Sequence, residues 1–206
     1  MECPGLSPRT EGVTAVVMTV FLLVVGTTDL SGTVPLACGI ERTSIWIATV
    51  WFIVIAGAIA VIDMQTRKIP DRIVYPSLVG IGLLYFSVSL SEAACAQEAS
   101  GTGEPLRVLT AFAGLTTLGG VYLMIAVVSH GSLGLGDVKY AALIGLTLGW
   151  HGWNGIVLGL LLPFLFGGAA AAVLLVGGRI GRREAVAFGP WMSLGAFTAL
   201  SLQLFA

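Results

Sequence analysis

Charged side chains are the scarcest class in this chain. Of its 206 residues only 10% are charged, comprising 10 basic and 11 acidic residues, whereas soluble domains carry roughly 25%. No polar stretch is long enough to build the core of a separate soluble domain. The net charge of −1 offers no basic surface for nucleic acid. We therefore predict an integral membrane protein that is surrounded by lipid and has no nucleic-acid partner.

The sequence also lacks the ligand spacings of a metal site. Its three cysteines, Cys3, Cys38 and Cys95, form no Cys-x-x-Cys pair, so we expect no zinc ribbon. Its two histidines, His130 and His151, are predicted at opposite membrane faces, which disfavours a metal site built on both. We expect neither a metal nor a cofactor. Cys38 and Cys95 are both predicted outside, where a disulfide is allowed; two unpaired thiols are the alternative.

Apolar sequence, in contrast, is abundant: 56% of the residues are hydrophobic and the mean hydropathy is +0.96. A helix needs about 20 apolar residues to cross a bilayer, and helices satisfy their own backbone hydrogen bonds in lipid. We predict an all-α membrane protein with about seven transmembrane helices, the fifth of them short. They lie near residues 12–29, 44–63, 73–90, 107–129, 138–150, 154–177 and 187–205. The first is expected to stay as an anchor, because two Glu and one Arg precede it, unlike a signal peptide.

The basic residues predict the orientation of these helices. Seven of the ten fall in three loops, as Arg67, Lys68 and Arg72, then Lys139, then Arg179, Arg182 and Arg183. The loop at 91–106 carries three glutamates and no basic residue. Because cytoplasmic loops are enriched in Lys and Arg, we predict that the three basic loops are cytoplasmic. The N-terminus is then inside and the C-terminus outside.

Two aspartates lie at the cytoplasmic ends of apolar segments, where a carboxylate is costly and indicates function. Asp137 follows two glycines in Gly134-Leu135-Gly136-Asp137 and has a helix cap as its alternative role. Asp63 ends the second apolar segment, where the helix dipole disfavours an anion; an ion pair with Arg67 is its alternative. Asp71, after Pro70, is interpreted as a cap or a loop ion pair.

A pair of aspartates can hydrolyse an amide without a metal. Two close carboxylates share one proton because both cannot ionise cheaply. The ionised member takes a proton from water while the protonated member donates to the carbonyl oxygen. Asp63 and Asp137 are therefore the predicted catalytic pair.

Three motifs resemble those of the type IV prepilin peptidases, which are Gly-x-Gly-Asp aspartic membrane proteases. Asp63 followed by Ile69-Pro70-Asp71 is similar to their first motif. Gly134-Leu135-Gly136-Asp137-Val138-Lys139 is similar to their second, and Phe188-Gly189-Pro190 to the segment that opens their last helix. The resemblance covers residues 44–205. It makes residues 1–43 an N-terminal anchor helix and outer loop, and residues 44–206 a six-helix catalytic domain.

The resemblance implies an aspartic endopeptidase that removes the basic leader from type IV prepilins or pseudopilins at the cytoplasmic membrane face. Its substrates would carry a basic leader before an apolar helix, in a pilus or protein-secretion system. Larger members have a loop with two Cys-x-x-Cys pairs, linked to N-methylation, and this chain has neither. We therefore expect a peptidase without methyltransferase activity. No feature of the sequence indicates an oligomeric state.

Three other interpretations remain at this point. Gly-Leu-Gly-Asp also resembles the presenilin and signal-peptide-peptidase branch, although Asp63 follows Ile62 rather than a Tyr, and the last helix has Phe188-Gly189-Pro190. A proton-coupled transporter would use both aspartates as proton sites, but such sites are expected near the membrane midplane. A silent assembly factor for a pilus machine is the third.

Overall fold

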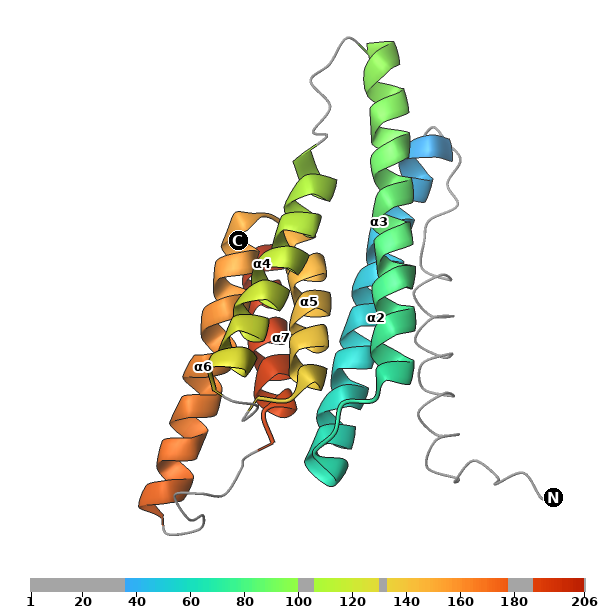
Figure 1. Ribbon diagram of the computed structural model, residues 1–206. Helices are drawn as coiled ribbons and strands as arrows, with labels where there is room; N and C mark the ends of the chain where they lie inside the picture. Colours follow the sequence, from blue (N-terminus) through green and yellow to red (C-terminus); the bar gives the residue numbers. More distant parts are fainter. Residues whose placement is uncertain (1–35, 100–105, 130–132, 178–186, 206) are drawn as a thin grey trace, which may run out of the picture.

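The computed structural model describes residues 36–99, 106–129, 133–177 and 187–205, and every regular element among them is an α-helix (Figure 1). The helices are α2 (Leu36–Thr66), α3 (Asp71–Ala99), α4 (Leu106–Val128), α5 (Leu135–Trp150), α6 (Trp153–Val176) and α7 (Gly189–Phe205). The predicted helix at 12–29 and the side chains of Cys38 and Cys95 lie outside the described residues. That helix and the disulfide therefore stay predictions.

Four of the described helices are long and apolar enough to cross a membrane: Thr43–Thr66, Asp71–Glu92, Arg107–Val128 and Trp153–Val176. The helices α5 and α7 have 16 and 17 residues, so each is about 24–26 Å long, short of the ~30 Å hydrocarbon core. The prediction of an all-α multi-pass membrane protein is confirmed. The total of seven spans stays a prediction.

Two predicted loop boundaries are wrong. The loop predicted at 91–106 is helical in its first part, because α3 continues to Ala99. Its 29 residues make it about 43 Å long, so its last turns extend beyond the apolar layer. The helix α2 likewise runs three residues past Asp63, and Arg67 ends it with φ 51°. Hydropathy marks where a segment leaves lipid, whereas a helix ends where its backbone hydrogen bonds stop.

Glycines let the helices approach each other closely. The tightest pair is α4 and α5: a Cβ on Gly145 would collide with the carbonyl group of Gly114, and one on Gly149 would lie 2.5 Å from the carbonyl oxygen of Thr110. Small residues have this role in membrane helices. The two glycines of Gly145-x-x-x-Gly149 thus serve packing of α5 against α4 within the chain.

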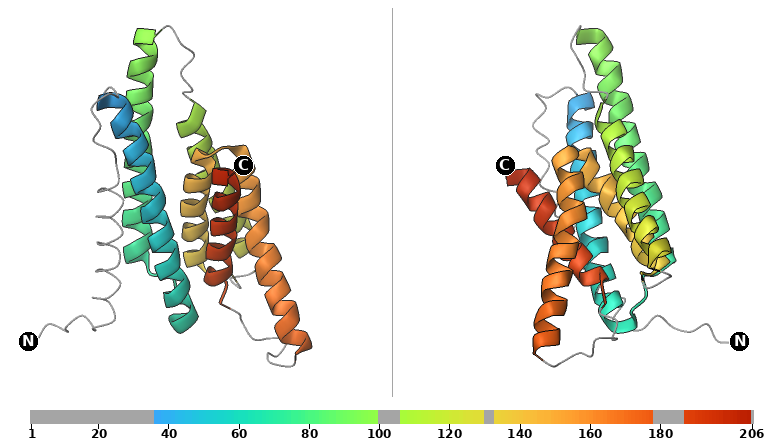
Figure 2. Two further views of the ribbon diagram at one scale, coloured as in Figure 1. Left: turned by 180° about the vertical axis from the view of Figure 1, so that it is seen from behind. Right: turned by 60° about the vertical axis from the view of Figure 1, so that its left-hand side comes forward.

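One end of the bundle collects the helix ends that flank the three basic loops. The C-terminal ends of α2, α4 and α6 and the N-terminal ends of α3, α5 and α7 all lie there, at the bottom of Figure 1 and again in both views of Figure 2. The described helix ends lie together, as the prediction that the three basic loops share one side requires, and the topology itself stays a prediction. Which side faces the cytoplasm stays a prediction.

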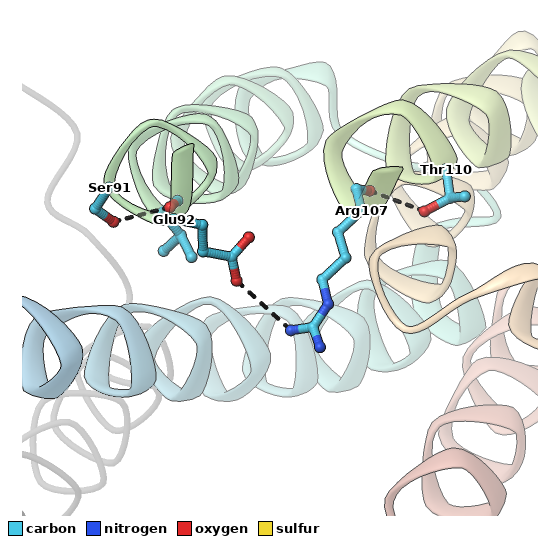
Figure 3. Close-up of polar contacts among 5 residues, drawn as sticks. Ser91, Glu92, Arg107 and Thr110 are labelled. Atoms are coloured by element: carbon cyan, nitrogen blue, oxygen red, sulfur yellow. Dashed lines mark hydrogen bonds and ion pairs between the residues drawn. The ribbon is translucent and has the colours of Figure 1, made fainter. Parts of the chain in front are cut away.

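At the opposite end, an ion pair joins α3 to α4. Figure 3 shows Glu92 and Arg107 pointing toward each other from the two helices, and Oε1 of Glu92 lies 3.7 Å from Nη1 of Arg107. Glu92 is 21 residues after the start of α3, or about 31 Å along it. This contact therefore stabilises the bundle far from the two aspartates.

Candidate active site

The two predicted catalytic aspartates line one cavity of about 830 Å³ at the end of the bundle that collects the basic loops. Asp63 comes from the last turns of α2 and Asp137 from the first turn of α5. The other described lining residues are Arg67, Lys68, Ile69, Pro70, Asp71, Arg72, Leu133, Gly134, Leu135, Gly136, Lys139, Ala187 and Phe188. The fold thus brings the three motifs together at one place.

Asp63 is buried, with 4% of its surface exposed, and it accepts a hydrogen bond of 2.9 Å on Oδ2 from the backbone N–H of Gly189. Among the described residues it makes no ion pair with Arg67, so that alternative is wrong. Gly189 must be glycine for this contact, because a Cβ there would lie 2.7 Å from Oδ2 of Asp63. Pro190 follows in the first turn of α7, where a missing N–H costs no helix hydrogen bond.

Asp137 caps the start of α5 and also lines the cavity. Its Oδ2 accepts a hydrogen bond of 3.3 Å from the N–H of Gly134, which is the returning half of a capping box. Its carboxyl group also lines the cavity. Burial, and then the negative charge of Asp63, raise the pKa of Asp137 to about 6, although the Gly134 N–H acts in the opposite direction. An aspartate with such a pKa retains a proton much closer to neutrality than an ordinary carboxyl group.

The loop at 67–70 packs directly on the start of α5. A Cβ on Gly136 would lie 3.0 Å from Cβ of Ile69, so this glycine allows the first motif to approach the second. Pro70 accepts the first backbone hydrogen bonds of α3 through its carbonyl oxygen, from Ile73 at 3.1 Å and Val74 at 3.3 Å. It therefore fixes where α3 starts and where the loop ends.

Lys139 and Asp71 form a second link between the two motifs. Nζ of Lys139 lies 2.9 Å and 2.8 Å from the two carboxylate oxygens of Asp71, and 4.9 Å from the ring centre of Tyr75. The prediction that Asp71 forms an ion pair is confirmed, although its partner was not predicted. Both side chains are partly exposed, at 30% for Lys139 and 55% for Asp71, so solvent screens the pair and it contributes little to stability.

Several residues near the aspartates were not predicted as site residues. Leu133 and Phe188 line the cavity. Tyr140 and Ser193 form a buried hydrogen bond of 2.7 Å, and Ser193 also donates to the carbonyl oxygen of Gly189. Helical spacing was the available signal, since Tyr140 lies three residues after Asp137. Within the described residues, no group of three or more His, Cys, Asp or Glu is arranged to hold a metal ion.

The family model of the type IV leader peptidase family matches residues 47–176, which include both aspartates and more than half of the chain. The chain belongs to the type IV leader peptidase family. The prediction of a membrane protease of this family, made from three motifs, is thereby confirmed. The match also favours this family over the presenilin branch and over a transporter.

Curated leader peptidases are similar to this chain over most of its length. It is 31% identical to the leader peptidase HopD of Salmonella typhimurium over 68% of this chain and 82% of that protein. Two prepilin leader peptidase/N-methyltransferases, from Dickeya chrysanthemi and Escherichia coli, are 31% and 33% identical over 71% and 69% of this chain. The chain spans only 47% and 57% of their lengths. No solved structure matches the chain.

Proposed function

We propose that this leader peptidase cleaves prepilin-like or pseudopilin precursors and that Asp63 and Asp137 are its catalytic residues. The observation that carries the proposal is that these two carboxyl groups, 74 residues apart in the sequence, line the same cavity. The prepilin leader peptidases among the relatives support the substrate class.

In this proposal the two aspartates have different chemical roles, which the raised pKa of Asp137 and the hydrogen bond to Asp63 support. Asp137 has its pKa raised to about 6 and is the member that keeps a proton. Asp63, whose carboxylate is oriented by Gly189, then takes a proton from water as the water oxygen attacks the scissile carbonyl carbon. Asp137 gives its proton to the carbonyl oxygen. Collapse of the tetrahedral intermediate breaks the C–N bond: one of its two hydroxyl groups returns its proton to Asp137 as the new carboxyl group forms, and the proton held by Asp63 passes to the leaving amine.

We also propose that the cavity opens at the cytoplasmic membrane face. Arg67, Lys68 and Arg72 are all exposed around it, and basic residues are attracted to the anionic lipids of the cytoplasmic leaflet. This orientation places the N-terminus inside and the C-terminus outside. A precursor held with its apolar helix in the bilayer would then present its basic leader to the cavity. Because the chain has no Cys-x-x-Cys pair, the proposal does not include N-methylation.

The test is cleavage of a co-expressed prepilin-like precursor, followed as a mobility shift and by mass spectrometry of the product. Asp63→Asn and Asp137→Asn should each insert normally and reduce cleavage by orders of magnitude, because an amide can neither take nor give the shared proton. The double variant should cleave little more slowly than either single variant, since the effects of residues that act as a unit are non-additive. Addition of a chelator should have no effect.

Two further variants are controls. Asp71→Asn breaks only a partly exposed ion pair and should reduce cleavage less than tenfold. Glu92→Gln, near the C-terminal end of α3 and away from the aspartates, should cleave like the unaltered protein. Full activity of either catalytic Asn variant, or inactivation by chelator, contradicts the two-aspartate mechanism. A cut within the apolar helix of the precursor would instead favour a presenilin-like activity.

A further inference from the structure

The helices that carry the two aspartates are joined through one buried hydroxyl group. Ser193 lies on α7, four residues after Gly189, and is 2% exposed. Its Oγ is 2.9 Å from the carbonyl oxygen of Ala56 on α2 and 3.1 Å from that of Gly189. It is also 2.7 Å from the hydroxyl oxygen of Tyr140 on α5. A single side chain therefore contacts α2, α5 and α7.

The number of available protons sets the direction of these hydrogen bonds. A serine hydroxyl has one proton, and a carbonyl oxygen can only accept. When Ser193 directs its proton to the nearer carbonyl oxygen, that of Ala56, and shares it only partly with that of Gly189, its oxygen accepts from the Tyr140 hydroxyl, and every hydroxyl proton has an acceptor. Because Tyr140 is 0% exposed, water cannot replace this acceptor. The Tyr140 hydroxyl depends on Ser193 for its hydrogen bond.

Each partner of the Tyr140–Ser193 hydrogen bond is also connected to one of the two aspartates. Tyr140 lies three residues after Asp137 and therefore on the same face of α5. On the other side, Ser193 contacts the carbonyl oxygen of Gly189, and the N–H of Gly189 donates to Asp63. The path from the helix of Asp137 to the carboxylate of Asp63 thus runs through Tyr140, Ser193 and Gly189.

We propose that Tyr140 and Ser193 are positioning residues, which hold α5 against α2 and α7 so that the two aspartates share the cavity in the correct relative placement. The inference rests on the proposed function, since it concerns the same pair of carboxylates. Neither residue belongs to the described lining of the cavity, so neither is expected to touch the substrate. Their effect is exerted through helix placement.

The test uses Tyr140→Phe and Ser193→Ala in the full chain, with cleavage rates normalised to the folded fraction. Each should reduce kcat about tenfold and leave KM within about twofold, because a misplaced carboxyl pair slows chemistry without removing a substrate contact. The double variant should be no slower than the slower single variant, since both changes break the same link.

Matched controls separate positioning from a general effect on the core. Tyr85→Phe alters another buried tyrosine, which stacks on Trp150 with ring centres 4.3 Å apart. Ser77→Ala alters another buried serine, whose hydroxyl donates within its own helix to the carbonyl oxygen of Ile73. Both controls should keep the kcat of the unaltered protein. The inference is overturned if Tyr140→Phe and Ser193→Ala turn over at the same rate as these controls, or if they lower only the folded fraction.

A second readout does not depend on cleavage. Dicyclohexylcarbodiimide reacts with protonated carboxyl groups, so its labelling of Asp137, read by mass spectrometry, falls as pH rises. Loosening α5 should let water in and separate the two carboxylates, and both changes favour the charged form of Asp137. The labelling midpoint of Asp137 should therefore move to lower pH by at least about half a unit in Tyr140→Phe. In Tyr85→Phe the midpoint should equal that of the unaltered protein. If the unaltered protein cleaves no prepilin-like precursor, the proposed substrate is wrong. The labelling midpoint, which needs no substrate, then tests by itself whether Tyr140 positions the two carboxylates. An unmoved midpoint in Tyr140→Phe overturns the positioning role.

Discussion

Replacing Gly189 with alanine tests how closely α7 must approach Asp63. The new Cβ would lie 2.7 Å from Oδ2 and 3.0 Å from Cγ of Asp63, too close for either group to stay in place. Asp63 is 4% exposed and has little room, so its carboxylate must swing away from the N–H of Gly189. A hydrogen bond to a charged group contributes about 1.5–3 kcal/mol, and a displacement of about 1 Å at a catalytic group costs roughly 10²-fold in rate.

We therefore expect Gly189→Ala to insert and fold but to lower kcat about 100-fold, which corresponds to about 2.7 kcal/mol in activation free energy. The assay is cleavage of the prepilin-like precursor, normalised to the folded fraction in detergent. Gly57→Ala on α2 is the control, because a Cβ built there would meet no atom within 4 Å other than those of its chain neighbours and its own helix backbone, and alanine favours a helix by about 1 kcal/mol. It should keep full activity. An equally active Gly189→Ala protein would refute the argument that this contact orients Asp63.

Three other predictions follow from the same structure. Because burial and the charge of Asp63 raise the pKa of Asp137 from 3.8 to about 6, carbodiimide labelling should fall as pH rises through about 6. The native state, which holds this proton more tightly than the unfolded chain, should lose stability as pH rises from about 4 to 6; a labelling midpoint near 4 contradicts this. Gly145→Leu places a side chain against the backbone of Gly114 and should destabilise the α4–α5 pair by several kcal/mol, seen as a lower melting temperature; an unchanged value refutes the close packing. Reporter fusions after Arg72 should report the cytoplasm and fusions within 91–106 the outside, and the reverse result would overturn the proposed orientation.

The class of the protein was predictable from composition. With so few charged residues, the chain must be covered by lipid. A segment that spans lipid must satisfy its backbone hydrogen bonds without water, and where no closed barrel is indicated it does so as an α-helix. The six later apolar segments each correspond to a described helix. The ends of α2 and α3 were less predictable, since Asp63 and the polar residues after Leu90 do not interrupt a helix even though they interrupt an apolar pattern.

The aspartates themselves were predictable because a carboxylate beside lipid is costly and rarely kept without a role. Both were selected from the sequence, Asp137 with the two glycines before it, and the cavity brings them together. Gly189 was selected only through a motif. Its physical role, a backbone N–H donated to Asp63 without a side chain in the way, became apparent from the close approach of α7.

The sequence by itself thus determined the membrane class, the helices and the candidate carboxylates, because each depends on the local balance of apolar and charged residues. The tertiary structure decided the partners. Lys139 pairs with Asp71 across 68 residues, Tyr140 with Ser193 across 53, and Gly189 with Asp63 across 126. Helical periodicity indicates which face a side chain occupies but not which helix lies against that face. That choice is made when glycine-lined surfaces pack against each other in lipid, and it brings the two aspartates into one cavity.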